Sequence, residues 1–318
     1  MKKVIALIVI VSCVMFFAMD IEKYPEIGQL AYENITDVEA NIYGFTQSKV
    51  DIDELSISLY ESEYDPEKET LLMLHGYSAD KDVWPRFARH FVDDYNVIIP
   101  DMAGHGDTGF DHQWGYRIPE QASRLIELLD VMDVGKVHVV GNSMGGFIAA
   151  HLAKDYPDRI LSSLLIDPAG VQAPELSDMD NMLSQGRNPF EIHSRSEFDE
   201  FYAMTMAQPP WLPDFVLGAV NEKYQSRREQ LKRIFSDFHH QDMLDDELNN
   251  IVSPVLLLWG KEDRILHVSS TDVWEAGVDN IKITIFSGVG HMPMVEVPVR
   301  TADLYKAFLD NLGFGDDA

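Results

Sequence analysis

Six short apolar runs, separated by longer mixed segments, constrain the fold of this chain more than any other feature of its sequence. They are of strand length and lie at 71–74, 97–99, 137–140, 161–166, 255–258 and 281–286. Near-continuous apolar runs are typical of strands buried on both faces, whereas a strand with one wet face alternates. Between them, segment 119–132 carries apolar residues at helical spacing. This alternation predicts an α/β architecture, with a mostly parallel sheet flanked by helices.

The α/β pattern covers residues 51–170 and 251–314 and is interrupted between them. Residues 171–250 contain helical fragments and a proline cluster at 209–213, but no comparable apolar run. An insertion that follows one strand and precedes the next predicts a helical cap over the strand ends. We therefore expect one α/β core with an inserted cap, rather than two independent domains.

Residues 1–19 have the order of an export signal, because Lys2 and Lys3 precede an apolar run from Val4 to Met19. As a helix this run would be about 24 Å long, short of the ~30 Å hydrocarbon layer of a membrane. Its end is poor for cleavage, which favours a retained membrane anchor facing the periplasm or the outside over a secreted protein. Lipidation at Cys13 and a buried first helix are the alternatives.

The net charge of −28 limits the partners of this chain. Sequence-independent binding to nucleic acid needs clustered Lys and Arg, so the charge argues against such a partner. It also disfavours electrostatic docking on anionic lipid. The single cysteine excludes an intramolecular disulfide and any multi-cysteine zinc or iron–sulfur site. His239 and His240, even with Asp242, are weak as a metal site, and we expect neither metal nor cofactor.

The segment 141–146 reads Gly-Asn-Ser-Met-Gly-Gly and fits the pattern G-x-S-x-G. In this pattern, small flanking residues let a serine sit on a sharp turn between a strand and a helix. The apolar run 137–140 leads into the motif, and a helical segment, 145–156, leads out of it. Because this is the setting that the pattern requires, Ser143 is predicted to be a nucleophile.

A serine is a weak nucleophile at neutral pH, so it needs a base that takes its proton and an acid that orients the base. Asp263 and His291 each lie in a loop that follows an apolar run, and we expect them to be the acid and the base. Asp167, which also ends such a run, is the alternative acid. Glu262 would project differently from its neighbour, and His267 has no strand before it.

Acyl transfer passes through a tetrahedral oxyanion, which backbone N–H groups can stabilise. The N–H of Met144, directly after the nucleophile, is expected to be one donor. The N–H of Tyr77 is expected to be the other, because the phrase His75-Gly76-Tyr77 follows the run 71–74 and its glycine lets the backbone turn in closely. We expect His75 to brace this loop rather than to take part in catalysis.

Over residues 51–312 the chain resembles the α/β-hydrolase superfamily. Within it, the chain is similar to cold-adapted bacterial lipases, often called family V, and to membrane-anchored monoacylglycerol lipases with an N-terminal apolar helix. The phrases that carry the resemblance are 75–82, 100–106, 141–146, 167–170 and 290–296, together with 208–213 for the bacterial group. The resemblance implies the α/β-hydrolase fold and acylglycerols or other fatty-acyl esters as substrates. Ala103 and the pair Asp107-Thr108 depart from the usual residues, a difference expected to tune a loop and not the chemistry.

These features together predict a serine ester hydrolase of the lipase type that works through an acyl-enzyme. We expect the acyl chain to lie against the cap residues Phe201, Met204 and Trp211, although such residues also suit the core of the cap. Two other functions stay open. A carbon–carbon bond hydrolase of aromatic ring-fission products shares the serine motif, but a small, glycine-rich stretch is expected there where this chain has Tyr77. A hydrolase-fold binding protein without turnover is the other, and the complete triad argues against it.

Overall fold

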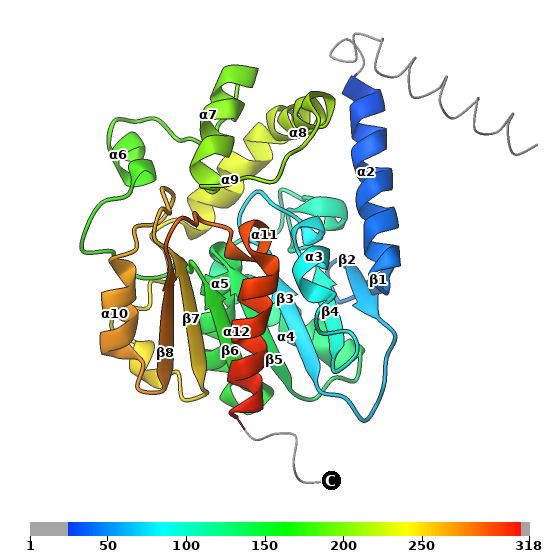
Figure 1. The fold of residues 1–318 in the computed structure, drawn as a ribbon, viewed down its shortest axis with the longest axis vertical. Helices are drawn as coiled ribbons and strands as arrows, with labels where there is room; N and C mark the ends of the chain where they lie inside the picture. Colours follow the sequence, from blue (N-terminus) through cyan, green and yellow to red (C-terminus); the bar gives the residue numbers. More distant parts are fainter. Residues whose placement is uncertain (1–24, 313–318) are drawn as a thin grey trace, which may run out of the picture.

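The computed structural model describes residues 25–312, without the side chains of 25–31, 33 and 34, and within that range a single sheet forms the centre of the protein (Figure 1). Its strand order is β1-β2-β4-β3-β5-β6-β7-β8. The strands are β1 (Phe45–Asp51), β2 (Ser56–Ser62), β3 (Thr70–Leu74), β4 (Asn96–Pro100), β5 (Val137–Asn142), β6 (Ile160–Ile166), β7 (Val255–Gly260) and β8 (Ile281–Phe286).

Strands β3 to β8 are the six that the apolar runs predict, and they pair in parallel. Strands β1 and β2 extend the sheet in antiparallel fashion. The predicted α/β pattern begins at residue 51, but β1 begins at Phe45. Its sequence, FTQSKVD, contains no apolar run, because most of its side chains are exposed or half-buried at the edge of the sheet. The predicted mostly parallel sheet flanked by helices is therefore confirmed, with a polar edge that the runs do not reveal.

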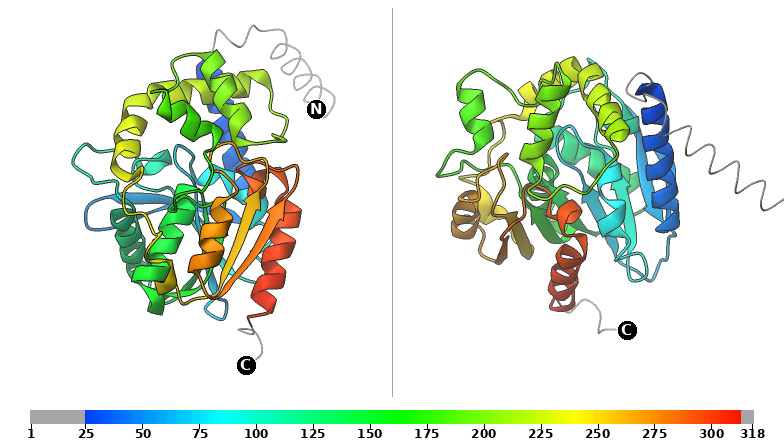
Figure 2. Two further views of the ribbon diagram at one scale, coloured as in Figure 1. Left: turned by 90° about the vertical axis from the view of Figure 1, so that its left-hand side faces the viewer. Right: turned by 45° about the horizontal axis from the view of Figure 1, so that its top comes forward.

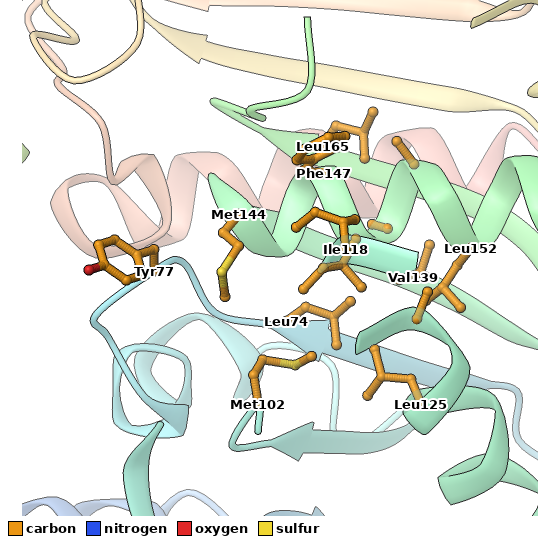
Figure 3. Close-up of a cluster of buried hydrophobic side chains, with 14 of the residues drawn as sticks. Leu74, Tyr77, Met102, Ile118, Leu125, Val139, Met144, Phe147, Leu152 and Leu165 are labelled. Carbon is orange, nitrogen blue, oxygen red and sulfur yellow. The ribbon is translucent and has the colours of Figure 1, made fainter. Parts of the chain in front are cut away.

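Helices cover both faces of the sheet, and the side chains of each strand alternate between two apolar layers. Leu72 and Leu74 of β3 pack into the layer of α4 (Ile118–Val131), α5 (Met144–Asp155) and α10 (Ser270–Gly277). Leu71 and Met73 pack into the layer of α3 (Pro85–Ala88), α11 (Pro293–Glu296) and α12 (Pro298–Asp310). Figure 3 shows the first layer, where Leu74, Met144 and Phe147 bring the end of β3 against α5. The loop that follows β3 therefore starts from a strand whose residues are all buried.

The segment 171–250 contains four α-helices and no strand, all of it within the described range. They are α6 (Asp178–Ser184), α7 (Arg195–Thr205), α8 (Asp214–Ser226) and α9 (Arg228–Phe238). These helices lie together over one end of the sheet (Figures 1 and 2). Short 3₁₀ helices complete the chain: η2 (Lys81–Val83), η3 (Gly106–Thr108), η4 (Pro157–Arg159) and η5 (Leu248–Asn250). Residues of α7 and α8 line one cavity together with residues of the loops that follow β3, β5 and β8, so these helices lie on the side of those loops.

Helix α2 (Pro25–Ile42) precedes the sheet and runs along its β1 edge toward α8 (Figure 1). Two polar contacts hold it against the core. The Tyr60 hydroxyl lies 2.9 Å from Asp37 Oδ1, and Arg86 Nε donates to Glu39 at 2.8 Å. The side chains of 35, 38 and 42 on this helix are exposed.

Among the described helices, none has the length and apolar character that a membrane span requires. The apolar run 4–19, and with it the proposed signal or anchor and Cys13, lies outside the described residues.

Candidate active site

Ser143 occupies a strained turn between β5 and α5. Its backbone angles are φ 57° and ψ −119°, a conformation that side-chain-bearing residues rarely adopt. The turn is tight because its glycines touch backbone. A Cβ on Gly141 would lie 2.2 Å from the carbonyl oxygen of Gly145, and a Cβ on Gly145 would lie 2.2 Å from that of Leu74. The sharp strand–turn–helix geometry that presents a serine is therefore built into this segment.

The loop after β3 lies directly against Ser143. A Cβ on Gly76 would come within 3.1 Å of the Ser143 Cβ. Within residues 25–312, the N–H of Tyr77 donates to no backbone acceptor, and Met144 is the first residue of α5, where N–H groups lack intrahelical partners. Two backbone N–H groups that have no acceptor among residues 25–312 therefore lie near the serine, which is the arrangement that an oxyanion hole requires.

His75 braces this loop from behind. Its Nδ1–H donates to the Gly76 carbonyl at 2.8 Å, and its Nε2 accepts from the N–H of Met102 at 3.0 Å. Burial lowers the pKa of His75, which keeps the ring neutral so that one nitrogen can donate while the other accepts. Both ring nitrogens are thus occupied, and the ring has a structural role.

His291 and Asp263 form a buried pair at the ends of two neighbouring strands. Nδ1 of His291 donates to Oδ2 of Asp263 at 2.6 Å. The other carboxylate oxygen, Oδ1, accepts the N–H groups of Ile265 at 2.8 Å and Leu266 at 3.0 Å. Asn142, next to the serine, donates from Nδ2 to the His291 carbonyl at 3.0 Å. These bonds fix the imidazole with Nε2 free to act as a base.

The other acidic and imidazole groups near the site have different partners. Glu262 accepts the N–H groups of Gly288 and Val289 at 2.7 and 3.1 Å. The ring of His267 bonds to Ser269 Oγ at 2.9 Å. Asp167 is buried beside the pair, with its Oδ1 accepting from the N–H of Gly260 at 2.8 Å. The structure thus brings Asp263, rather than Glu262, to the histidine.

Within the described range, one trio of side chains has its potential ligand atoms close enough to hold a metal, namely Asp167, Asp263 and His291. The His291–Asp263 hydrogen bond already uses the space between two of them. His239 and His240 are not part of such a group. The ring of His239 stacks on Phe235 with 4.3 Å between centroids, and burial lowers its pKa to about 4.

Two cavities meet at Ser143. The larger has a volume of about 230 Å³ and extends from Ser143 and His291 between the cap and α2. Its wall is mostly apolar and includes Phe198, Phe201, Tyr202, Met206, Leu212, Leu217, Val220 and Val295. The smaller, of about 80 Å³, lies on the side of Met144, Phe147 and Phe238. Such an apolar space around a nucleophile suits the acyl part of a lipid ester.

Of the three side chains expected on the acyl wall, one lines the larger cavity. Phe201 does so, but Met204 is buried in the apolar core between cap and sheet. Trp211 is 85% exposed, because it lies in a proline-flanked loop that turns its side chain to solvent. Met204 and Trp211 therefore do not line this cavity, whereas Phe198 and Met206 do, and the contact of an acyl chain with any of these residues stays a prediction.

Charged side chains line the larger cavity near α2, where Asp80 is buried and Asp82 and Lys223 are half-buried. Lys223 of α8 donates to Asp80 at 2.7 Å. The Tyr60 hydroxyl has one proton but lies 2.9 Å from Oδ1 of both Asp37 and Asp82. One of these contacts therefore needs a proton on a carboxyl. Burial, and then the charge of Asp80, raises the pKa of Asp82 to about 7, which identifies Asp82 as the group that holds this proton in acid.

Replacing Asp82 with asparagine should stabilise the protein at pH 8. The folded state raises the pKa of Asp82 to about 7 from 3.8, so the wild type loses stability as the pH rises through this window. Asparagine cannot ionise and can still donate to Tyr60. The free energy of unfolding in urea should exceed that of the wild type by more than about 1 kcal/mol at pH 8 and should match it near pH 4. An equal gain at both pH values, or a gain from the exposed Asp93→Asn control, would contradict this account.

Two contributions to the site carry no sequence motif. The Tyr77 hydroxyl donates to the Leu231 carbonyl of α9 at 2.6 Å, which ties the oxyanion loop to the cap. Asn142 links the serine turn to the histidine loop. Asn142 lies inside the serine motif, but the motif does not predict its bond to the His291 carbonyl. No motif predicts the bond of the Tyr77 hydroxyl, because it joins two segments that are far apart in the sequence.

The chain is similar to known proteins over most of its length. The model of the Alpha/beta hydrolase family matches residues 71–304, a range that includes Ser143, Asp263 and His291. Lipase 3 of Moraxella sp. (strain TA144) is 30% identical, over 85% of this chain and 89% of the lipase. A monoacylglycerol lipase of Xenopus laevis is 28% identical, over 79% of this chain and 78% of its own. The crystal structure of a membrane phospholipase A, titled a bacterial virulence factor, is similar with a TM-score of 0.87 at 33% identity, and the match covers 99% of this chain and 100% of that one.

Proposed function

This chain belongs to the alpha/beta hydrolase family, and on that premise we propose that it hydrolyses fatty-acyl esters, acylglycerols among them, with Ser143, His291 and Asp263. It is a carboxylic ester hydrolase of the lipase type, like its relatives. The observation that carries the assignment of roles is the hydrogen bond of 2.6 Å between His291 and Asp263. His291 and the strained Ser143 line the same cavity.

The reaction follows from the hydrogen bonds of the three residues. Because Nδ1 of His291 donates to Asp263, Nε2 takes the proton of the Ser143 hydroxyl as its Oγ attacks the acyl carbonyl. The N–H groups of Tyr77 and Met144 stabilise the oxyanion, at about 3 kcal/mol for a donor. His291 then gives the proton to the leaving alcohol, and a water molecule activated by the same nitrogen releases the fatty acid from Ser143.

The class of substrate is supported by the apolar wall and by the relatives. The larger cavity leads away from Ser143 toward α2 and α8, and phenylalanine, leucine and valine side chains line it. A single fatty-acyl chain needs such a lining along its length. The similar proteins are a lipase, a monoacylglycerol lipase and a phospholipase, and acyl-ester cleavage is common to these names.

Filling the α8 part of this cavity should shorten the acyl chains that the enzyme accepts. Val220 lines the cavity from α8, so Val220→Phe should lower kcat/KM for a dodecanoyl ester by about tenfold. The value for a butanoyl ester should stay within about twofold, since a short chain ends before the obstruction. The measurement is a chain-length profile with soluble esters. Val131→Phe on the exposed face of α4 is the matched control, and an equal loss for both esters would place the acyl chain elsewhere.

We also infer that the protein is exported and held at a membrane by the apolar segment 4–19. The support is the order of charge and apolar residues in 1–19 and the similarity to a membrane phospholipase. In cell fractionation, the full chain should sediment with membranes and be released by detergent but not by high salt. A chain that starts at residue 25 should appear in the soluble fraction, and its sedimentation with membranes would contradict an anchor in this segment.

A further inference from the structure

Asp167 is a second buried carboxyl group beside the His291–Asp263 pair. It follows β6 directly and has a positive φ of 44°, so the backbone turns sharply to place it. Oδ1 accepts the N–H of Gly260 at 2.8 Å. Oδ2 is fully buried, and no donor among the described residues reaches it. A buried carboxylate oxygen without a donor is costly, so the protonation state of this group needs an explanation.

The groups around Asp167 explain its protonation state. One oxygen of its carboxyl, one of Asp263 and one nitrogen of His291 all lie within 4.8 Å of one another, and all three side chains are buried. The negative charge of Glu296 also raises the pKa of Asp167, as a smaller cause. Two carboxylates at such a distance cannot both be charged at neutral pH, and the pair keeps one proton.

The hydrogen bonds decide which carboxyl keeps the proton. Asp263 accepts three donors, the N–H groups of Ile265 and Leu266 and the Nδ1–H of His291, and all three favour its charged form. Asp167 accepts one. Burial, and then the charge of Asp263, raises the pKa of Asp167 well above its usual range. The proton therefore belongs to Asp167.

We propose that Asp167 is a neutral positioning residue that donates its carboxyl proton from Oδ2 to the Asp263 carboxylate. This bond gives the buried Oδ2 its partner and holds Asp263 in line with the imidazole. It rests on the proposed function, because its purpose is to orient the acid of the triad. Asp167 does not touch the substrate and acts only through Asp263.

The activity test uses two variants of the full chain. Asp167→Asn keeps a donor, cannot ionise and tolerates positive φ. It should keep kcat/KM for a soluble ester within about threefold, with the acid limb of the pH profile unmoved. Asp167→Ala removes the donor and should lower kcat by about tenfold with KM unchanged. If Asp167 were charged, Asp167→Asn would remove a negative charge next to His291 and move the acid limb to lower pH by about one unit, which would overturn the proposal.

A spectroscopic test is independent of turnover and of the folding of the alanine variant. At pH 9, infrared spectra of the wild type in D₂O should show the carbonyl band of a protonated, buried carboxyl group, and Asp167→Asn should lack it. Asp82→Asn is the control that keeps the band, because the pKa of Asp82 is about 7 and its carboxyl is ionised at pH 9. Absence of the band in the wild type, or its survival in Asp167→Asn, would overturn the proposal. Failure of the proposed function would instead appear as a wild type that hydrolyses no ester, whatever the infrared result.

Discussion

Ser143→Ala is expected to lower kcat for a soluble fatty-acyl ester by about a millionfold, the loss seen when the nucleophile of a triad is removed from a serine protease. Without Oγ no acyl-enzyme forms, and His291 and Asp263 have no proton to move. The strained turn remains, since alanine keeps the Cβ at φ 57°, so the protein should fold and bind substrate. The measurement is steady-state hydrolysis, together with covalent labelling by a fluorophosphonate probe.

A second buried serine of the site provides the control. Ser270 lines the smaller cavity from α10, so Ser270→Ala changes the same side chain near the same space. It should be labelled by the fluorophosphonate and should keep activity within about twofold, whereas Ser143→Ala should show neither label nor turnover. Labelling or ester hydrolysis that survives in Ser143→Ala would remove this residue from the mechanism. Exclusive turnover of a dienoate ring-fission product by the wild type would overturn the choice of ester as substrate.

The strands that carry the site were predictable because they are buried on both faces. In β3, β5 and β7 every residue is buried, so the apolar run in the sequence coincides with the strand. Strand β1 has a buried first residue and then mostly exposed or half-buried ones, and its pairing with β2 is decided by backbone hydrogen bonds rather than by side chains. An edge of this kind leaves a weak pattern in the sequence.

The positions of Ser143, Asp263 and His291 were predictable for a related reason. Ser143 and Asp263 follow the buried strands β5 and β7, and His291 follows β8, an apolar run that is mostly half-buried or exposed at the edge of the sheet. The carboxyl ends of these parallel strands meet at one edge of the sheet. No such rule predicts which side chains of the cap are buried. Trp211 and Phe201 have the same apolar character in the sequence, but Trp211 is 85% exposed and Phe201 is 3% exposed. The difference depends on how helices from distant segments pack, which local spacing does not encode.

The protonation states of three carboxyl groups could not be predicted from the sequence either. Asp82, Asp167 and Asp263 look alike as aspartates in loops or short turns, but their surroundings differ. Asp263 accepts three hydrogen bonds from donors, and Asp167 accepts one while facing Asp263. Asp82 shares the Tyr60 hydroxyl with Asp37. The charge of a carboxyl group that is shielded from solvent depends on how many hydrogen-bond donors and charged groups surround it. These groups come together only in the folded chain.

Asp263→Asn is expected to lower kcat by about ten-thousandfold, as the same change does in a serine protease triad. Asparagine has nearly the shape of aspartate, so the loop should keep its form. However, its amide nitrogen cannot accept the Nδ1–H of His291, and the ring is then held in the tautomer that lacks a free base at Nε2. KM should change little, because Asp263 does not line either cavity. The measurement is kcat and KM for one soluble ester across a range of pH.

The neighbouring acid is the control that makes this result specific. Glu262 bonds to the N–H groups of Gly288 and Val289 in the loop before His291, so Glu262→Gln tests whether support of that loop alone explains a loss. An amide oxygen still accepts from an N–H, and Glu262→Gln should therefore keep kcat within about threefold. Comparable losses in the two variants would mean that the loop needs both carboxylates for its structure. A loss confined to Asp263→Asn identifies the carboxylate that is 2.6 Å from the imidazole as the one that sets its tautomer.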